Sequence, residues 1–451
     1  MFPLPLTCFE EYMLHDDRPA YPMNGVFRLR FAGHLDREAF EAALASAVQR
    51  HPLLRATIDR KSKRRPRWID HPDWLPTVQW QAETNPNGLP SATHIDLTQE
   101  PGTRVWIVDR EDGHDVVLQA HHCCTDAIGM SKVFEDLLIG YALNQGITDP
   151  VDSLPELATN RLAGRGAPGL NAWKFLRMSH KQAIGLHGVR KFVMHSAVPL
   201  AQADADIDET VPPATFPNPQ AFDLNSNETK ALIGTAKSQK VTVNDLLARD
   251  LFLAIGTWRK ANNIGHDRDW LRLSVPMNLR TPNDQSMPMA NSVSMFFLDR
   301  QPRCFSDPSR LLKGIYRQTQ RIKRLELQYT FIFSLGLSRR IPGGLSRTTA
   351  VDKCQSTSCL SNLGPVLART PLPRHEGRIV SGNVTLEELD FVIPLRPLLN
   401  AAFCVYTYAG RLRVLMHYDP RTIAEDCSSG LLETYAHQIR QTIQQNMDSF
   451  S

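Results

Sequence analysis

The stretch that decides the fold is Asp115–Phe134, which reads DVVLQAHHCCTDAIGMSKVF. Its first part, Asp115–His122, is a short apolar run containing β-branched residues and predicts a buried strand. Apolar side chains then recur at helical spacing from Val133 onward, and Gly146 is suited to end that helix. The polar segment HHCCTD therefore lies where a strand ends and a helix begins, a place from which side chains can be aimed into a cleft.

Strand and helix patterns alternate on both sides of this junction. Upstream, Gly25–Gly33 alternates apolar and basic residues like a half-buried strand, and a helix follows that Asp36 can cap and His51-Pro52 stops. Downstream, the residues predict a helix starting at Thr242, a helix over 308–327, a final helix within 423–445, and strands at 271–280, 291–299, 356–362, 400–408 and 412–418. This mixture predicts an α/β (α+β layered) fold.

Length and composition predict more than one packing unit. The chain has 451 residues, with 51 Lys or Arg, 47 Asp or Glu, a formal net charge of +4 and 42% hydrophobic residues, which is too apolar for a disordered chain. The segment 197–222 is rich in Pro and Ala, as linkers are. We therefore expect an N-terminal lobe at 1–200 carrying the histidine pair, a linker at 201–221 and a C-terminal lobe at 222–451.

Cysteine usage and the chain start favour a cytoplasmic protein. The eight cysteines show no paired zinc spacing and are too sparse for a disulfide scaffold. The first residues, MFPLPLTCFEEYML, lack a basic leader and a cleavage site, and no uncharged apolar stretch approaches 18 residues.

Three chemistries compete for the junction. A metal site needs converging ligands, but neighbouring strand residues alternate faces. A nucleophile at Cys123 or Cys124 needs a thiolate beside its base, and adjacent residues seldom provide that geometry. A neutral histidine, with an ordinary pKa of about 6.5, can instead take a proton from a hydroxyl or amine that attacks an acyl group. The histidine base is favoured, with Asp126 anchoring the turn through an arginine from elsewhere.

The spacing of His121, His122 and Asp126, followed by Ala127 and then by Gly129, resembles the HHxxxDG signature of the chloramphenicol-acetyltransferase-like superfamily. This superfamily includes condensation domains, wax ester synthases, polyketide-associated acyltransferases and alcohol acetyltransferases. Further segments are similar to family segments in matching order, namely 9–14, 33–56, 241–254, 275–280 and 360–365. The resemblance covers nearly the whole chain. It implies two acetyltransferase-like lobes in a V with a central tunnel.

The resemblance also implies residue roles. His122 matches the catalytic base, His121 its partly structural neighbour, and Asp126 the aspartate that pairs with an arginine, for which Arg280 is the candidate. Ser361 and Asn362 are candidates for the tunnel wall. Ala127 stands where the family usually has Gly, which narrows the space beside the donor arm and makes an inactive relative more credible.

The function implied is a stand-alone acyltransferase that moves an acyl group from a thioester, acyl-CoA or an acyl-phosphopantetheine on a carrier protein, to a hydroxyl or amine. No metal, permanently bound cofactor or nucleic-acid partner is expected. One alternative is a condensation-type enzyme dedicated to a separate carrier protein in peptide, polyketide or lipid biosynthesis. Another is a non-catalytic binding or scaffold relative. The acyl chain length, the acceptor, the choice of ester or amide and the oligomeric state stay open.

One further stretch is chemically distinctive. Residues 157–203 contain no acid but seven Lys or Arg, together with Trp173 and Phe192. Such a surface can attract a phosphate-bearing ligand, an acidic protein or an anionic membrane. The alternative is a crossover segment that packs its aromatic residues on the body and leaves its charges in water.

Overall fold

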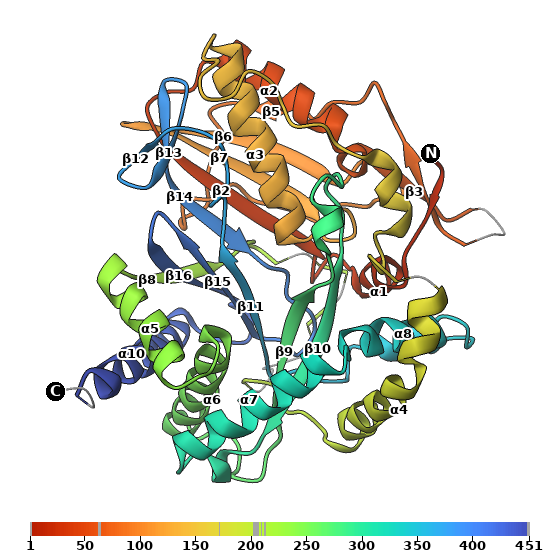
Figure 1. Cartoon of the computed structure of the whole chain (residues 1–451), viewed down its shortest axis with the longest axis vertical. Helices are drawn as coiled ribbons and strands as arrows, with labels where there is room; N and C mark the ends of the chain where they lie inside the picture. The colour runs from red at the N-terminus through yellow and green to blue at the C-terminus, as the bar shows by residue number, and fades with distance from the viewer. Residues whose placement is uncertain are drawn as a thin grey trace.

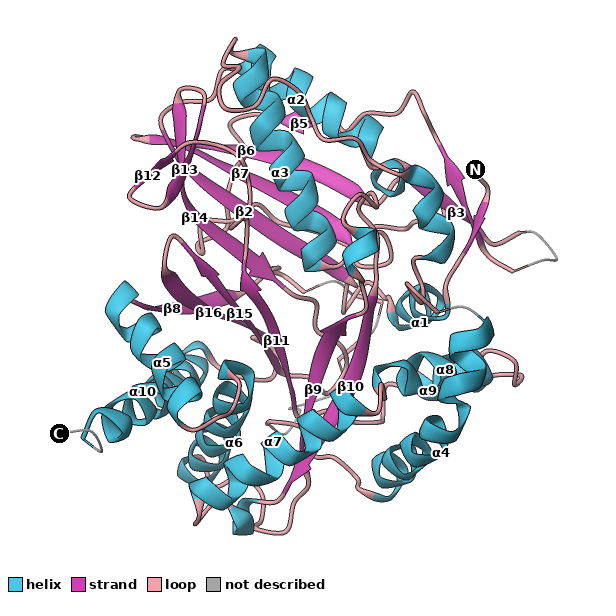
Figure 2. Cartoon of the chain, viewed as in Figure 1, coloured by secondary structure: helices cyan, strands magenta, loops and turns pink. Residues whose placement is uncertain are grey.

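The computed structural model describes residues 2–61, 65–170, 172–201, 207–208, 210–211 and 213–448. Two large sheets, each covered by helices, form two lobes that meet near the middle of the molecule (Figure 1). The colouring by secondary structure shows the strands of both sheets converging on that region, with the helices outside them (Figure 2). The predicted α/β layered fold is confirmed.

The first lobe is built on a seven-stranded sheet in the order β12-β13-β14-β2-β7-β6-β5. Helices α2 (Arg37–Arg50) and α3 (Ala127–Asn144) lie across it (Figure 1). Its strands are β12 (Arg374–His375), β13 (Arg378–Ser381), β14 (Val384–Val392), β2 (Asn24–Ala32), β7 (Gly113–His121), β6 (Thr103–Arg110) and β5 (Val78–Gln79). Strand β7 is buried along its whole length between β2 and β6. Its end therefore has a fixed position.

The second lobe is built on a six-stranded sheet in the order β10-β9-β11-β15-β16-β8. Its strands are β10 (Val293–Arg300), β9 (Leu271–Asn278), β11 (Ser358–Pro365), β15 (Ala401–Tyr408), β16 (Arg411–Tyr418) and β8 (Pro219–Leu224). The helices of this lobe are α5 (Ser226–Ser238), α6 (Val243–Ala261), α7 (Pro308–Arg324) and α10 (Glu425–Asp448). Leu251 and Phe252 of α6, Phe403 of β15 and Tyr435 of α10 share one buried core.

The remaining elements lie outside the two large sheets and the helices named above. They are α1 (Cys8–Asp16), α4 (Ala172–Met194), α8 (Gln328–Ser338), α9 (Gly344–Thr348), a small sheet of β1 (Leu4–Pro5), β4 (Arg67–Asp70) and β3 (Ala56–Asp59), and short 3₁₀ helices at 52–54, 159–164, 282–284 and 302–304. Within the described ranges, no helix combines the length and apolar character needed to cross a membrane.

Local signals explain where several helices begin and end. The Asp36 carboxylate accepts a hydrogen bond of 2.8 Å from the Ala39 amide and caps α2, as predicted. Thr242 and Asp245 form a reciprocal capping box at the start of α6. Gly146 adopts a left-handed φ of 77° shortly after α3 ends, a conformation that glycine accepts without strain.

Part of the chain that follows the linker belongs to the first lobe. Strands β12–β14 fall within the range 222–451 but pair with the first sheet, through β14 against β2. Tyr406 of β15 donates a hydrogen bond of 2.6 Å to the Leu389 carbonyl of β14, which ties the crossing segment back to the second sheet. The division into 1–200, 201–221 and 222–451 stays a prediction, and residues 202–206, 209 and 212 of that linker lie outside the described residues.

Candidate active site

An open cavity with a volume of about 1110 Å³ lies where the two lobes meet. Its walls come from α1, the turn between β7 and α3, strands β9, β10 and β11, and residues 393–399. Of the residues selected from the sequence, His122, Asp126, Ala127, Ser361 and Asn362 line it. The structure thus brings together two segments that are more than 230 residues apart in the sequence.

The His122 imidazole is oriented by the backbone of its own turn. Its Nδ1 lies 2.8 Å from the Thr125 carbonyl oxygen, which can only accept, so Nδ1 carries the proton and donates. In the neutral ring Nε2 is then unprotonated. Backbone hydrogen bonds hold the residue itself, from His122 N to the Met23 carbonyl (2.7 Å) and from Asn291 Nδ2 to the His122 carbonyl (2.7 Å). In this arrangement the unprotonated Nε2 can act as a base, and His122 lines the cavity between the lobes.

Burial lowers the pKa of His122 below its ordinary value, and the hydrogen bond to Thr125 and the charge of Asp126 offset part of that effect. The neutral, basic form is therefore present at neutral pH. For a reaction that uses His122 as its base, we expect kcat/KM to stay constant on acidification to below about pH 6.5 and to fall only as pH drops through the lowered pKa. A pH profile of kcat/KM with an inflection above pH 6.5 would contradict this.

His121 takes different partners from its neighbour. Its Nδ1 accepts a hydrogen bond of 3.1 Å from the Cys123 amide, and its Nε2 lies 3.2 Å from Asp17 Oδ2. The residue is fully buried and does not line the cavity. His94 also contacts Asp17, at 2.7 Å, and although burial raises the pKa of Asp17, the two histidines hold it below its ordinary value. These contacts suit a residue that supports the turn.

Asp126 ties the turn to the second lobe. As the N-cap of α3, its Oδ1 accepts from the Gly129 amide at 2.7 Å, while its Oδ2 accepts from the Ser292 amide at 2.8 Å and from Arg280 Nη1 at 2.9 Å. Both charged side chains are 8% exposed. Arg280 Nη2 also donates to the Ala290 carbonyl at 2.7 Å. The pairing inferred from the family resemblance is thus present in the structure, and its part in catalysis stays a prediction.

The two small residues after Asp126 differ in how tightly they are enclosed. A Cβ on Gly129 would lie 2.6 Å from Thr125 Oγ1 and 2.7 Å from the Ala290 carbonyl oxygen, so this position has no room for a side chain. Ala127 is the first residue of α3, has no positive φ, and is half-buried on the cavity wall. Alanine at 127 therefore takes space from the cavity without straining the backbone.

Gly129→Ala is expected to destabilise the protein by about 1–3 kcal/mol, because a backbone carbonyl cannot move aside as a flexible side chain can. Thermal or urea unfolding measures this loss. Gly430→Ala in α10 is the matched control, since nothing lies within 4 Å of its added Cβ. Equal stability of the Gly129 variant and the wild type would contradict the packing described here.

The part of the cavity wall that belongs to the second sheet follows a pattern of alternate residues that sequence analysis missed. On three adjacent strands the cavity is lined by Val293, Met295 and Phe297 of β10, Ser274, Pro276 and Asn278 of β9, and Cys359, Ser361 and Leu363 of β11. Residues two apart share one face of a strand. The alternating pattern of residues within 291–299 and 271–280 can be read from the sequence. That these residues form one wall depends on which strands pair with each other, and the sequence does not give the pairing order. Asn362 also lines the cavity, and its Oδ1 accepts from the Gly364 amide at 2.9 Å.

The cysteines of the turn are enclosed. Cys123 and Cys124 are both fully buried, and burial raises the pKa of each thiol well above its ordinary value. Cys123 Sγ donates to the Glu10 carbonyl at 3.3 Å. Neutral, buried thiols are poor nucleophiles, so the geometry favours the histidine over either cysteine.

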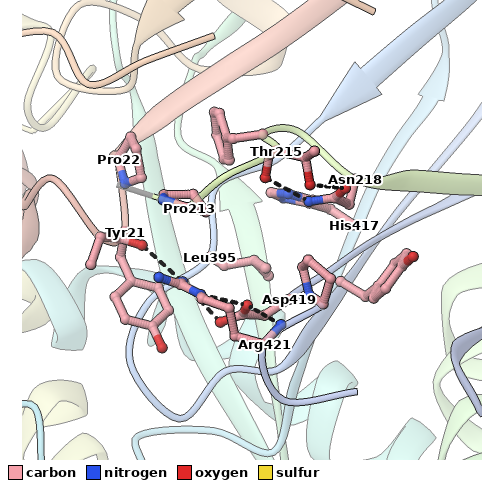
Figure 3. A pocket seen from close by; sticks show the side chains of 13 residues that line it. Tyr21, Pro22, Pro213, Thr215, Asn218, Leu395, His417, Asp419 and Arg421 are labelled. Atoms are coloured by element: carbon pink, nitrogen blue, oxygen red, sulfur yellow. Dashed lines mark hydrogen bonds and ion pairs between the residues drawn. The ribbon is translucent and has the colours of Figure 1, made fainter. Parts of the chain in front are cut away.

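A second, smaller pocket of about 270 Å³ lies beside Tyr21, Pro213, His417 and Arg421 (Figure 3). The Arg421 guanidinium there is occupied by Asp419, at 2.8 and 2.9 Å, and by the Ala20 carbonyl, at 2.8 Å. Neither His122 nor Asp126 lines this pocket. The histidine motif therefore belongs to the larger cavity.

Comparison with known proteins agrees with this architecture. Residues 11–155 match the family model of the Condensation domain. An uncharacterised protein of Mycobacterium tuberculosis (strain ATCC 25618 / H37Rv) is 23% identical over 441 residues, covering 93% of this chain and 95% of that protein. A 135-residue stretch is 31% identical to isonitrile lipopeptide synthase of the same strain, covering 28% of this chain and 5% of the synthase.

Among solved structures, the first condensation domain of the calcium-dependent antibiotic synthetase, in complex with a substrate analogue, aligns with a TM-score of 0.70 at 14% identity. The alignment covers 98% of this chain and 97% of that chain. The chain shares its two-lobed fold with these solved structures, and the histidine motif lies at the cavity between the lobes. The chain is therefore similar to condensation domains, by family model over residues 11–155 and by fold over nearly its whole length.

Proposed function

We propose that this protein is an acyltransferase that moves an acyl group from a thioester to a hydroxyl or amine, with His122 as general base. The observation that carries the proposal is the hydrogen bond of 2.8 Å from His122 Nδ1 to the Thr125 carbonyl, which leaves Nε2 as the proton acceptor in a residue that lines a cavity of about 1110 Å³. Neutral histidine at neutral pH is suited to this role.

In the proposed reaction the acceptor gives its proton to His122 Nε2 while its oxygen or nitrogen bonds to the thioester carbonyl carbon. The carbon–sulfur bond then breaks, and the imidazolium returns the proton to the departing thiolate. The products are an ester or amide and a free thiol, so no acyl group need be attached to the protein. Asp126 and Arg280 keep the turn in place without touching the reacting atoms.

The donor in this proposal is acyl-CoA or an acyl-phosphopantetheine on a carrier protein, because both present the same thioester on the same flexible arm. Similarity to part of isonitrile lipopeptide synthase supports a carrier-linked donor in peptide or lipid biosynthesis. Ala127, at the first turn of α3, narrows the cavity beside the base. The intact set of His122, Asp126 and Arg280 supports catalysis over a purely binding role.

A panel of acyl-CoA and acyl-carrier thioesters, assayed for thiol release with and without small alcohols and amines, tests the function. We expect acceptor-dependent thiol release for at least one pairing, and a preference for carrier-linked donors would identify the condensation-type alternative. Absence of His122-dependent release with every pairing would overturn the enzyme proposal and favour the binding or scaffold relative.

A further inference from the structure

Helix α4 (Ala172–Met194) exposes an unusual amount of apolar surface. Of the twelve large apolar side chains that are exposed in the described part of the chain, six lie on this helix, namely Trp173, Leu176, Ile184, Leu186, Val193 and Met194. Trp173 is 74% exposed and Val193 68%. Two more, Leu337 and Ile341, lie at the end of the neighbouring helix α8 and just after it. A concentration of this kind marks an interaction surface.

The same helix is basic and carries no acidic residue. Arg177, Arg190 and Lys191 are exposed beside the apolar side chains. At 100° per residue, Trp173, Ile184 and Lys191 project from one side of the helix, and Leu176 and Met194 lie close to that side. Apolar and positively charged groups therefore share the outer face.

The inner face of α4 is attached to the body of the protein. Gln182 accepts a hydrogen bond of 2.8 Å from Thr330 of α8, and Lys181 lies 3.4 Å from Glu326. Near the end of the helix, the rings of Phe192 and Phe297 are 4.7 Å apart, and Phe297 lines the large cavity. The outer face is thus free while the helix backs onto the wall of the candidate active site, at the edge of the molecule (Figure 1).

We propose that α4, with the end of α8, binds the surface of an anionic membrane. The apolar side chains would enter the boundary between headgroups and acyl chains, and the Arg and Lys side chains would bind anionic headgroups. The exposed apolar residues are spread along a helix about 35 Å long, and a flat, extended surface contacts this whole length at once. An acidic carrier protein would pair with the charges but leave part of this apolar length in water.

Co-sedimentation with vesicles tests the proposal in the full chain. Wild-type protein is expected to bind vesicles of phosphatidylcholine with about 30% phosphatidylglycerol, to bind pure phosphatidylcholine vesicles much more weakly, and to lose binding as salt screens the charges. Leu176→Ser with Met194→Ser should weaken the partition coefficient by at least about tenfold, since each side chain loses its burial in the membrane. Arg190→Glu with Lys191→Glu should weaken it at least as much.

Matched controls separate this helix from general effects. Leu75→Ser with Ile147→Ser removes two exposed apolar side chains elsewhere, and Lys313→Glu with Arg317→Glu reverses two exposed charges on α7, a basic helix without large exposed apolar residues. Both controls should bind anionic vesicles like the wild type.

The proposal would be overturned if the α4 and α7 charge variants lost vesicle binding equally. It would also be overturned if the wild type bound neutral and anionic vesicles equally well. Binding to an acidic carrier protein without binding to vesicles would assign the surface to a protein partner instead. Because the substituted residues lie outside the cavity lining, thiol release with a soluble acyl-CoA should be unchanged in the α4 variants, so this proposal and the proposed acyltransferase function can fail separately.

Discussion

His122→Ala is expected to lower acyl transfer by about 10² to 10⁴-fold, the usual contribution of a positioned general base. The loss should appear in kcat, because the imidazole takes its proton in the transition state and no bond to it is required for substrates to enter the cavity. Steady-state kinetics of thiol release with the best donor and acceptor pair measures it.

The same variant should stay folded. The backbone hydrogen bonds of residue 122, to the Met23 carbonyl and from Asn291, do not depend on the side chain. The substitution removes the bond to the Thr125 carbonyl, at a cost of about 0.5–1.5 kcal/mol, together with a longer contact of 3.4 Å to Asn291 Nδ2 and the edge-on contact with the Phe9 ring. His437→Ala, which removes an exposed imidazole of α10, is the matched control and should keep full activity. Full activity of His122→Ala would exclude this residue as the base.

Asp126→Ala is expected to cost about 3–5 kcal/mol of stability, because it leaves the Arg280 charge buried without its partner. The amides of Gly129 and Ser292 lose their acceptor as well. Urea unfolding of the variant and the wild type measures the difference. Glu100→Ala is the matched control, because its ion pair with Arg104 is partly exposed to solvent, and it should cost less than about 1 kcal/mol.

Arg280→Ala provides a milder version of the same test. The Asp126 carboxylate then keeps both backbone donors, so we expect a smaller loss of stability and a soluble protein in which kcat can be measured. Since the turn is tied to the second lobe through Arg280 and Ala290, kcat should fall while the variant remains folded. Unchanged stability and unchanged kcat in both variants would show that this ion pair does not support the site.

The elements around the histidine pair could be predicted from the sequence because their signals are local. Strand β7, the helix that follows it and the cap at Asp36 each rest on periodicity or on one side chain beside its own helix. The link between Asp126 and Arg280 spans more than 150 residues, and no local pattern contains it. Arg280 could be named as the candidate partner of Asp126 only through the family resemblance.

What the sequence could not provide depends on how distant strands pair. Strands β12–β14 follow residues of the second lobe yet join the first sheet, and hydrophobic alternation along a strand does not identify its partner. The cavity wall of Met295, Ser274 and Ser361 depends on the order β10-β9-β11 for the same reason. Helix α4 escaped prediction because its apolar residues are not confined to a single buried stripe.

The central claim is direct transfer of an acyl group to an acceptor by His122. Its most direct test is mass spectrometry of the products formed from an isotope-labelled acyl thioester and an acceptor, with wild-type protein and His122→Ala side by side. We predict labelled ester or amide with the wild type and about 10² to 10⁴ times less with the variant. Equal amounts of labelled product from both proteins would contradict it.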